Sequence, residues 1–399
     1  MPIKSKSPSR KLNPLLPTPR FAGCSTQLFV TLLFMPRPIL LSAFVLATTS
    51  LANAQWEIQS APTTASLRGI HALGNGIAWS SGSSGTVLRT TDDGAHWQLC
   101  ATSPDAEKLD FRGIQAFDEN TAIVMSSGKG DLSRLYKTID GCQTWKLLFT
   151  NPDKEGFWDA IKFVDRTRGY LLGDPVKDRF RVWRTMDSGE TWQDQQDSLL
   201  TTFRANPLTQ GAFAASNSAL WVTNLDQTYL AFGTGGTAGA MVYSIARFAL
   251  ATGGAGGGSR WETSMGDKTQ SSGIFSIYFR YDAGSFPTGV AVGGDYTKPD
   301  DSTNTAAQTR TGAINWQPAQ TPPHGYRSSV AYDPTQKLWI TVGPNGTDIS
   351  RDDGKNWTAL KPTAKDQPDA DKNWNALSLP LVVGPHGRIG RLNAKTLAP

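Results

Sequence analysis

Short segments in which apolar and polar residues alternate recur along most of the chain, at intervals of roughly 40–50 residues. Alternation with a period of two is typical of a β-strand with one buried face. The segments with this pattern are 67–73, 111–117, 157–163 and 326–332, with weaker copies at 273–279 and 373–379. A second apolar run, a glycine-containing turn and a third strand pattern follow, so the chain is predicted to be all-β.

The four clearest units continue into one motif, hydroxyl-x-Asp-x-Gly-x-x-Trp. In the second copy, Cys142 replaces the glycine. The Asp side chain can accept hydrogen bonds from backbone N–H groups of the turn, and the glycine permits a positive φ. The tryptophan can bury its ring while its N–H finds a carbonyl. No nucleophile stands beside a base, so these residues are interpreted as structural. They are Asp92, Gly94, Trp97, Asp140, Trp145, Asp187, Gly189, Trp192, Asp352, Gly354 and Trp357.

Four short strands per unit predict a propeller blade. The tryptophan of each motif is expected to open the fourth strand. Seven blades are predicted within a single domain over 55–399, at 67–103, 110–151, 157–199, 209–264, 272–320, 326–362 and 373–397. The last has only three strands, and 55–60 is predicted to supply its outer strand, which closes the ring and removes open edges. Six or eight blades are the alternatives, because 200–320 is hard to divide.

The N-terminal segment 1–54 is predicted to be an upstream extension followed by a signal peptide. Arg37, the apolar run 39–52 and Ala52-Asn-Ala54 fit the basic, apolar and small-residue regions of an export signal. Met35 is an alternative start. A transmembrane anchor is the other interpretation, but the apolar run is short for a bilayer. The mature chain would then begin at Gln55 and be periplasmic or secreted.

Charge changes this picture little. The whole chain carries a formal net charge of +5, but six basic residues and no acidic ones lie in 1–54. The remainder is nearly neutral, so nucleic-acid binding is not expected. Beyond the leader the only cysteines are Cys100 and Cys142. Two separate buried thiols are expected, with a disulfide as the alternative that export would permit.

The Asp motifs resemble BNR/Asp-box repeats of sialidase-type propellers. The wider pattern resembles the photosystem II stability/assembly factor-like proteins. The segments that carry this second resemblance are 157–165 with 185–192, 211–216, 273–277 and 292–296. The resemblance implies a seven-bladed propeller that acts as an assembly or binding factor.

A ligand site is predicted on the face of the ring opposite the Asp motifs. In a propeller, the third-to-fourth turns share one face, whereas the inner strands begin on the other, beside the second-to-third turns. Arginines, aromatic rings and carboxylates there could hold an anionic or peptide ligand. The candidate residues are Arg68, Arg112, Trp158, Asp159, Asp174, Asp295, Arg327 and Trp374. The alternative is that these residues only join neighbouring blades.

Two enzymatic interpretations find less support. A sialidase needs three arginines, a Tyr–Glu pair and an acidic Asp, but no Tyr–Glu pair stands out. An oxidoreductase could use the glycine-rich segment 233–238, which lacks the strand–turn–helix context of a dinucleotide loop. We therefore predict a monomeric, non-catalytic protein without metal or cofactor, which binds a protein or extracellular ligand. A sialidase-like glycoside hydrolase acting at the channel mouth is the alternative.

Overall fold

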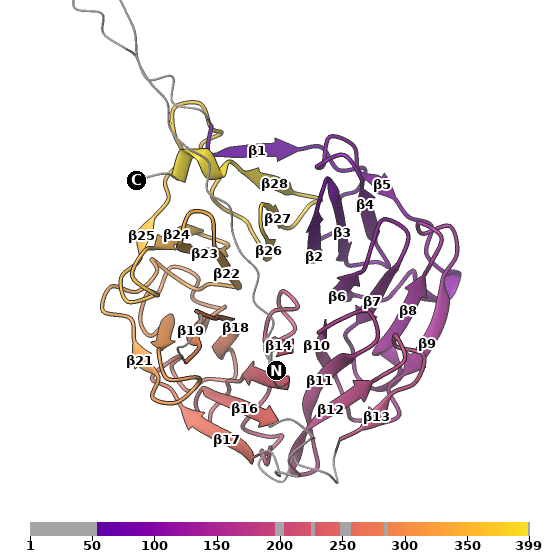
Figure 1. The fold of residues 1–399 in the computed structure, drawn as a ribbon, viewed down its shortest axis with the longest axis horizontal. Coiled ribbons are helices and arrows are strands. Elements are labelled where there is room, and N and C mark those ends of the chain that lie inside the picture. The colour runs from indigo at the N-terminus through magenta and orange to yellow at the C-terminus, as the bar shows by residue number, and fades with distance from the viewer. Residues whose placement is uncertain (1–53, 196–202, 225–227, 248–256, 283–285, 398–399) are drawn as a thin grey trace, which may run out of the picture. The chain divides into compact units, whose positions relative to one another are not determined.

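The computed structural model of the chain describes residues 54–195, 203–224, 228–247, 257–282 and 286–397. The predicted leader therefore lies outside the described residues, apart from Ala54. The described strands form seven antiparallel four-stranded sheets, which are arranged around a ring (Figure 1). The predicted seven-bladed propeller is confirmed.

Each of the first six blades is built from four strands in sequence order, from the centre of the ring outwards. Blade 1 contains β2 (Leu67–Gly74), β3 (Ile77–Gly82), β4 (Val87–Thr90) and β5 (Gln98–Leu99). Blade 2 contains β6 (Phe111–Ala116), β7 (Ala122–Ser126), β8 (Arg134–Thr138) and β9 (Lys146–Thr150). Blade 3 contains β10 (Trp158–Phe163), β11 (Gly169–Val176), β12 (Arg179–Thr185) and β13 (Gln193–Asp194).

The next three blades repeat this plan. Blade 4 contains β14 (Leu220–Asn224), β15 (Thr228–Gly233), β16 (Met241–Arg247) and β17 (Gly257–Glu262). Blade 5 contains β18 (Ser272–Arg280), β19 (Thr288–Asp295), β20 (Ala306–Thr309) and β21 (Gln317–Pro318). Blade 6 contains β22 (Ser329–Asp333), β23 (Leu338–Gly343), β24 (Gly346–Ser350) and β25 (Thr358–Ala359). Short 3-10 helices cover Pro104–Ala106, Gly130–Leu132 and Ala394–Leu397.

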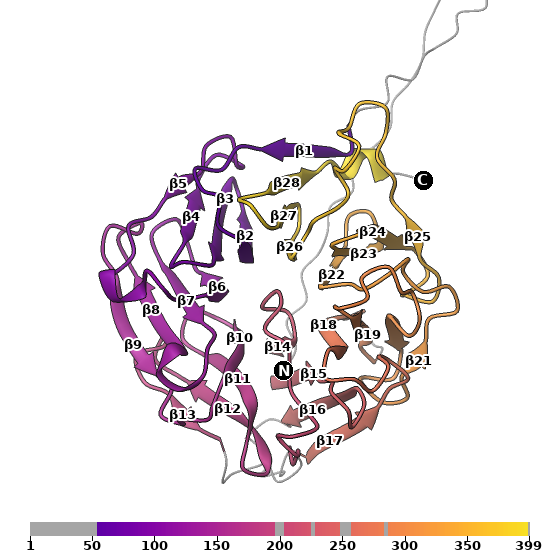
Figure 2. The same ribbon diagram turned by 180° about the vertical axis from the view of Figure 1, so that it is seen from behind.

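Blade 7 joins the two ends of the propeller. It contains β26 (Ala376–Ser378), β27 (Leu381–Val383), β28 (Ile389–Leu392) and, as its outer strand, β1 (Trp56–Gln59). Strand β1 pairs with β28 from Trp56 opposite Leu392 to Gln59 opposite Ile389. In both ribbon views β1 lies beside β28 at the rim (Figure 2). The predicted closure of the ring by the first strand is therefore confirmed.

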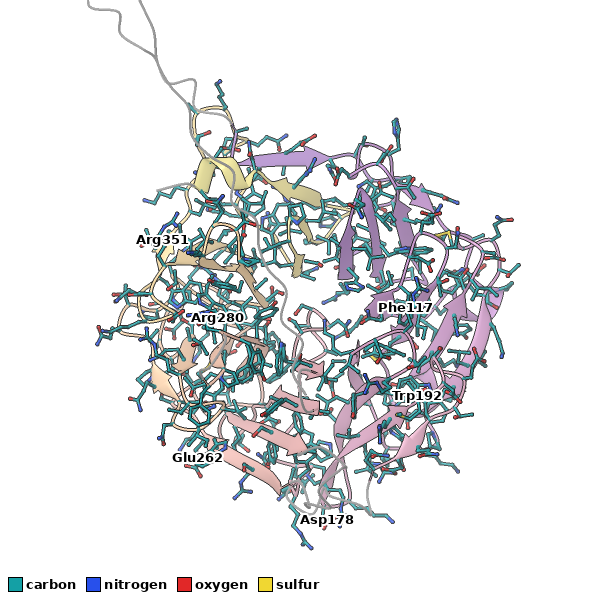
Figure 3. The ribbon with its side chains drawn as sticks, in the orientation of Figure 1. Phe117, Asp178, Trp192, Glu262, Arg280 and Arg351 are labelled. Atoms are coloured by element: carbon teal, nitrogen blue, oxygen red, sulfur yellow. A yellow bond between two sulfur atoms is a disulfide. The ribbon has the colours of Figure 1, made fainter. Side chains whose placement is uncertain are left out.

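The hydrophobic core is divided among the spaces between neighbouring blades. Seven buried clusters occur in the described residues, and each combines side chains from two adjacent blades. Side chains fill the spaces between the blades in Figure 3. Each blade has a neighbouring blade on both sides and must bury both faces of its sheet. Successive side chains of a strand point to opposite faces, so each strand contributes to two of these clusters.

A disulfide joins Cys100, after the outer strand of blade 1, to Cys142 in the third-to-fourth turn of blade 2. Their Cα atoms lie 5.5 Å apart, which is within the range that a disulfide can bridge. The expectation of two separate thiols is therefore wrong. Cys142 takes the glycine place of its motif with φ at 67°, and this turn reaches across to the neighbouring blade.

Candidate functional site

The four Asp motifs all lie in third-to-fourth turns, and their hydroxyl, carboxylate and backbone groups make the same contacts. In blade 3 the Thr185 hydroxyl donates to Asp187 at 2.8 Å and accepts the N–H of Gly189 at 2.9 Å. Asp187 Oδ1 accepts the N–H of Thr191 at 2.9 Å. Corresponding bonds hold Asp92, Asp140 and Asp352. These residues are occupied in shaping the turns.

The four motif tryptophans differ in how their indole N–H groups are satisfied. Trp192 and Trp357 each donate to the carbonyl of the motif glycine at 3.0 Å. Trp97 donates instead to the Gln59 side chain at 3.0 Å. The indole nitrogen of Trp145 has no partner among the described residues. Trp97 and Trp357 are buried, whereas Trp145 and Trp192 are partly exposed, so the motif tolerates variation at its last position.

On the opposite face, a cavity of about 540 Å³ opens where the inner strands begin. One residue near the first end of an inner strand lines it from each of six blades. These residues are Arg68, Arg112, Asp159, Phe275, Ser328 and Asn375. We call this cavity the mouth pocket. Of the eight predicted ligand-binding residues, five line it: Arg68, Arg112, Asp159, Asp174 and Trp374.

A repeated backbone irregularity sets this position. Arg68, Arg112, Asp159 and Phe275 are each skipped in the pairing between the first and second strands of their blades. Such a β-bulge places an extra residue on one strand and re-aims its side chain. Asp174 is skipped in the same way between β11 and β12. Bulges therefore turn these side chains out of the ordinary alternation at the pocket.

Three predicted residues do not line the mouth pocket, and two of them are displaced by one position in the register. Trp158 and Arg327 occupy the buried place that Leu67 holds in blade 1, while Asp159 and Ser328 take the pocket place of Arg68. Trp158 is 1% exposed and stacks on Phe149 with ring centroids 5.3 Å apart. Because side chains alternate along a strand, a shift of one residue exchanges the buried and the open side.

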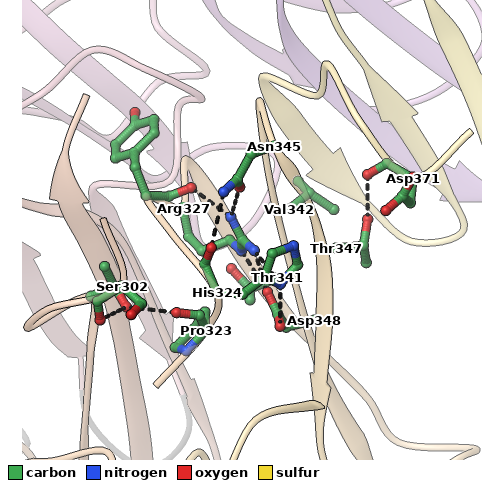
Figure 4. A network of polar contacts seen from close by, with 12 residues as sticks. Ser302, Pro323, His324, Arg327, Thr341, Val342, Asn345, Thr347, Asp348 and Asp371 are labelled. Carbon is green, nitrogen blue, oxygen red and sulfur yellow. Dashed lines mark hydrogen bonds and ion pairs between the residues drawn. The ribbon is translucent and has the colours of Figure 1, made fainter. Parts of the chain in front are cut away.

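Arg327 is fully buried in a polar network within blade 6 (Figure 4). Its guanidinium forms an ion pair with Asp348 and donates to the carbonyl of Tyr326 at 2.8 Å. His324 contacts Asp348 at 2.8 Å on the other oxygen. A buried arginine with a carboxylate partner has no capacity left for a ligand, so Arg327 is a structural residue.

Asp295 is the third residue outside the pocket. It is 4% exposed, and it accepts hydrogen bonds from the N–H and hydroxyl of Thr297 at 2.9 and 2.6 Å and from Thr269 at 3.1 Å. Burial opposes ionisation, but these bonds outweigh it and lower its pKa to about 2. Asp295 therefore stabilises the turn that it begins, and the adjacent Tyr296 lines the pocket instead.

The segment 211–219, which precedes blade 4, forms the inner end of the mouth pocket. In both ribbon views it projects toward the centre of the ring beside β14. Asn217 accepts the N–H of Ile161 at 2.8 Å and donates to the carbonyl of Ile114 at 3.1 Å. Ser216 donates to the carbonyl of Ser328 at 2.7 Å. The segment thus bridges inner strands of blades 2, 3 and 6, and we call it the plug loop.

The small residues of the plug loop explain its position. Its alanines Ala212, Ala214 and Ala215 line the mouth pocket, whereas Ser216 and Ser218 line a second cavity at the opposite ends of the inner strands. A Cβ atom on Gly113 of β6 would lie 3.0 Å from Asn217 Oδ1, so that glycine makes room for the loop. The plug loop lies between the two cavities. In the sequence, only a family resemblance marks this segment.

An aromatic wall, which the sequence did not predict, completes the pocket. Phe213 of the plug loop stacks on Phe275 with ring centroids 3.9 Å apart, and Tyr326 meets Phe275 edge-on at 4.7 Å. Tyr296 and Phe157 also line the pocket. The aromatic residues come from several blades, and among them only Phe157 and Tyr326 occupy equivalent places in their repeats, so no single repeated pattern identifies them all in the sequence.

The two arginines of the pocket have partly structural roles. Arg112 Nε pairs with Asp110 Oδ2 at 2.7 Å, and Arg112 also donates to the carbonyl of Ala214 at 3.3 Å. Burial and the neighbouring Arg112 lower the pKa of Arg68, while Asp110 and Tyr326 oppose this. Arg112 therefore supports the plug loop, and Arg68 keeps a guanidinium close to the pocket.

The two carboxyl groups of the pocket lie in a different environment. Asp159 is 1% exposed, and neither of its carboxylate oxygens has a hydrogen-bond partner among the described residues. Asp174 is partly exposed, and its Oδ1 accepts the N–H of Ala212 at 2.9 Å. Burial and then the Asp174 carboxyl raise the pKa of Asp159 well above its usual value, against the effect of Arg112. Burial raises the pKa of Asp174 to about 6.

Within the described ranges, no group of three or more His, Cys, Asp or Glu side chains could hold a metal ion. No helix in the same ranges is long and apolar enough to cross a membrane.

No protein-family model matches the sequence, and no curated protein does so either. The fold is similar to that of YCF48 bound to D1 peptide, with 15% identity, a TM-score of 0.53, and coverage of 85% of this chain and 96% of that chain. It is also similar to YCF48 from Cyanidioschyzon merolae, with 16% identity, a TM-score of 0.55, and coverage of 86% and 100%.

A third similar structure is the GH74 xyloglucanase from Xanthomonas campestris, at 16% identity and a TM-score of 0.51. That match covers 85% of this chain, which spans about half of the xyloglucanase, 54% of its length. At these identities the likeness shows the propeller fold and leaves the function open.

Proposed function

We propose that the protein is a non-catalytic binding module that holds a segment of another protein in the mouth pocket. The observation that carries this proposal is the convergence of charged and aromatic side chains from several blades on one cavity. Aromatic rings supply contact area, and a few polar groups orient the ligand. One protein of similar fold, YCF48, has been solved bound to D1 peptide, which supports a peptide as the kind of ligand.

We also propose that the protein acts in the periplasm or outside the cell. The disulfide between Cys100 and Cys142 supports this, because disulfides persist mainly in oxidising compartments. N-terminal sequencing of the protein from its native source tests the leader: a chain that still starts at Met1 or Met35 would contradict export by signal cleavage.

The binding proposal is tested by selecting a phage-displayed random peptide library on the full-length protein. Two variants then locate the site: Ala215→Trp fills the mouth pocket from the plug loop, and Met186→Trp adds the same ring to the opposite face, where Met186 is 51% exposed. Selected peptides should lose at least about tenfold in affinity for Ala215→Trp and bind Met186→Trp like the wild type. Failure to select peptides, or equal binding to Ala215→Trp, would refute the proposal.

One observation favours the alternative of a glycoside hydrolase. Asp159 and Asp174 converge on one pocket, and glycosidases use two carboxyl groups. Such enzymes keep one carboxyl protonated and the other ionised, whereas burial raises the pKa of both groups here. A panel of fluorogenic glycosides distinguishes the two functions: turnover that disappears in Asp159→Asn would establish the hydrolase.

A further inference from the structure

Asp159 is a buried carboxyl group for which the fold supplies no partner. It lies at the start of β10, is 1% exposed, and lines the mouth pocket with both oxygens unpaired among the described residues. The buried carboxylate of Asp348, by contrast, is paired with Arg327 and His324. An isolated buried carboxylate is costly, so Asp159 either keeps a proton or receives a counter-charge from outside.

Asp174 places a second carboxyl group beside the first. It lies on the neighbouring strand β11, and bulges turn both residues to the pocket. The two groups interact strongly enough that Asp174 contributes to the raised pKa of Asp159. Two carboxylates close together repel each other, and a cation between them would remove both the repulsion and the desolvation penalty.

The arginines of the pocket do not provide that cation. Arg112 favours ionisation of Asp159, but its guanidinium is held by Asp110 at 2.7 Å and by the carbonyl of Ala214 at 3.3 Å. Neither Asp159 nor Asp174 forms an ion pair among the described residues. Arg68 also lines the pocket, but the charges that act on it are those of Arg112, Asp110 and Tyr326, so the pair holds its protons until a ligand brings a counter-charge.

The surroundings of the pair suit an alkylammonium group. The N–H of Ala212 is bonded to Asp174, and the next residue, Phe213, begins the aromatic wall with its stack on Phe275. An ammonium group on an apolar stem can place its charge at the carboxylates and its methylenes against the rings. A carboxylate ligand would instead face two acidic groups at this end of the pocket.

We propose that Asp159 and Asp174 together receive a primary ammonium group of the bound peptide, so that the mouth pocket selects peptides with a lysine side chain or a free N-terminus. This inference rests on the proposed peptide-binding function and names the chemistry that the pocket recognises. Asp174 is the more exposed of the two carboxyl groups, and Asp159 is the buried one.

Binding of the ammonium group should be coupled to proton release. Because burial raises the pKa of Asp174 to about 6, the free pair holds protons that a bound cation displaces. Affinity should therefore rise as the pH increases through about 6. The charged or titratable groups that face or adjoin the pair are Arg68, Arg112, Asp110, Tyr296 and Tyr326.

The test uses four fluorescent degenerate peptide pools and the full-length protein. Three pools are N-acetylated and hold lysine, norleucine or glutamate at one central position, and the fourth holds norleucine with a free N-terminus. The wild type should bind the lysine pool, the free N-terminal pool, or both, at least about tenfold more tightly than the acetylated norleucine pool. The preferred pool identifies the source of the ammonium group, and its binding should tighten from pH 5 to pH 7.

Asp159→Asn and Asp174→Asn should each remove this preference, so that each variant binds the ammonium-bearing pools no more tightly than the acetylated norleucine pool. Asp131→Asn removes a charge from an exposed residue of blade 2 and is the matched control, which should keep the preference. Thermal melting verifies that each variant is folded. If acetylated norleucine or glutamate peptides bind as tightly as ammonium-bearing ones, this inference is wrong while the binding function stands. If no pool binds, both are wrong.

Discussion

The two faces of the ring use aspartate in opposite ways. On the Asp-motif face, Asp140 accepts hydrogen bonds from the hydroxyl and N–H of Thr144 and from the Thr138 hydroxyl, and these bonds lower its pKa to about 2. On the pocket face, Asp159 has no hydrogen-bond donor among the described residues, and its pKa is raised. The same type of side chain thus stabilises the turns of one face, whereas its burial without a partner destabilises the other.

This difference separates structural repetition from a candidate site. A carboxylate that satisfies backbone N–H groups contributes to folding wherever the motif occurs. A carboxyl that is buried without a partner persists only because the rest of the ring holds it, and such groups cluster at functional sites. The aspartates of the Asp motifs therefore belong to the scaffold, and Asp159 and Asp174 mark the place where a ligand is expected.

Removing an aromatic ring from each face should give the largest contrast. Trp357 is 4% exposed on the Asp-motif side, whereas Tyr296 is 53% exposed at the pocket. Trp357→Ala should lower the free energy of unfolding by roughly 3–5 kcal/mol, because it leaves a cavity between blades. Tyr296→Ala should change it by about 0.5 kcal/mol or less. Denaturant unfolding measures both, and similar losses would show that the two faces do not differ in this way.

The same isosteric substitution on the two faces should have opposite signs. Asp352 Oδ2 accepts the Asn356 side-chain amide at 2.8 Å, so Asp352→Asn should cost about 1 kcal/mol by setting two donors against each other. Asp159→Asn removes an unpaired buried carboxyl and should raise stability at pH 8 by about 1 kcal/mol. Thermal melting at pH 8 measures each change. A destabilised Asp159→Asn would mean that the fold uses this carboxylate.

The two faces should also differ in how they make stability depend on pH. The pKa of an aspartate in an unfolded chain is about 3.9, whereas the pKa of Asp174 in the pocket is raised to about 6. Between these values the folded protein binds more protons, so the stabilisation from the pair is complete below about pH 4 and is lost as the pH rises through 6. Asp140, with its pKa lowered to about 2, loses its contribution as the pH falls toward that value.

Unfolding free energies measured from pH 3 to pH 8 test both limbs. The variant with Asp159→Asn and Asp174→Asn should lose the decline above pH 4 and keep the loss of stability at the acid end. An unchanged decline in that variant would assign it to other groups.

Much of the architecture could be predicted from the sequence, because it depends on features that repeat. Alternating strands, the Asp motifs and the alternating segment 55–60 predict seven blades and a ring closed by the first strand, and the structure confirms both. The choice of face follows from the same repeat, since the motif marks the third-to-fourth turn. Five of eight candidate residues line the mouth pocket for this reason.

The errors arose where one residue of register or a contact between distant segments decides the outcome. Trp158 and Arg327 were predicted to lie in the site together with Asp159, but only Asp159, at a bulge, lines the pocket in blade 3, and Ser328 takes this place in blade 6. The Cys100–Cys142 bond could not be predicted because its two sulfur atoms belong to different blades.

By itself, the sequence determined the blade, the number of blades and the strand that closes the ring, because local alternation and turn chemistry are enough to specify a repeated unit. Only the tertiary structure decided which side chains reach the mouth pocket, because six blades and the plug loop supply its lining from positions far apart in the chain. Asp159 is an ordinary strand residue in the sequence. Its unpaired burial exists only once the ring has closed around it.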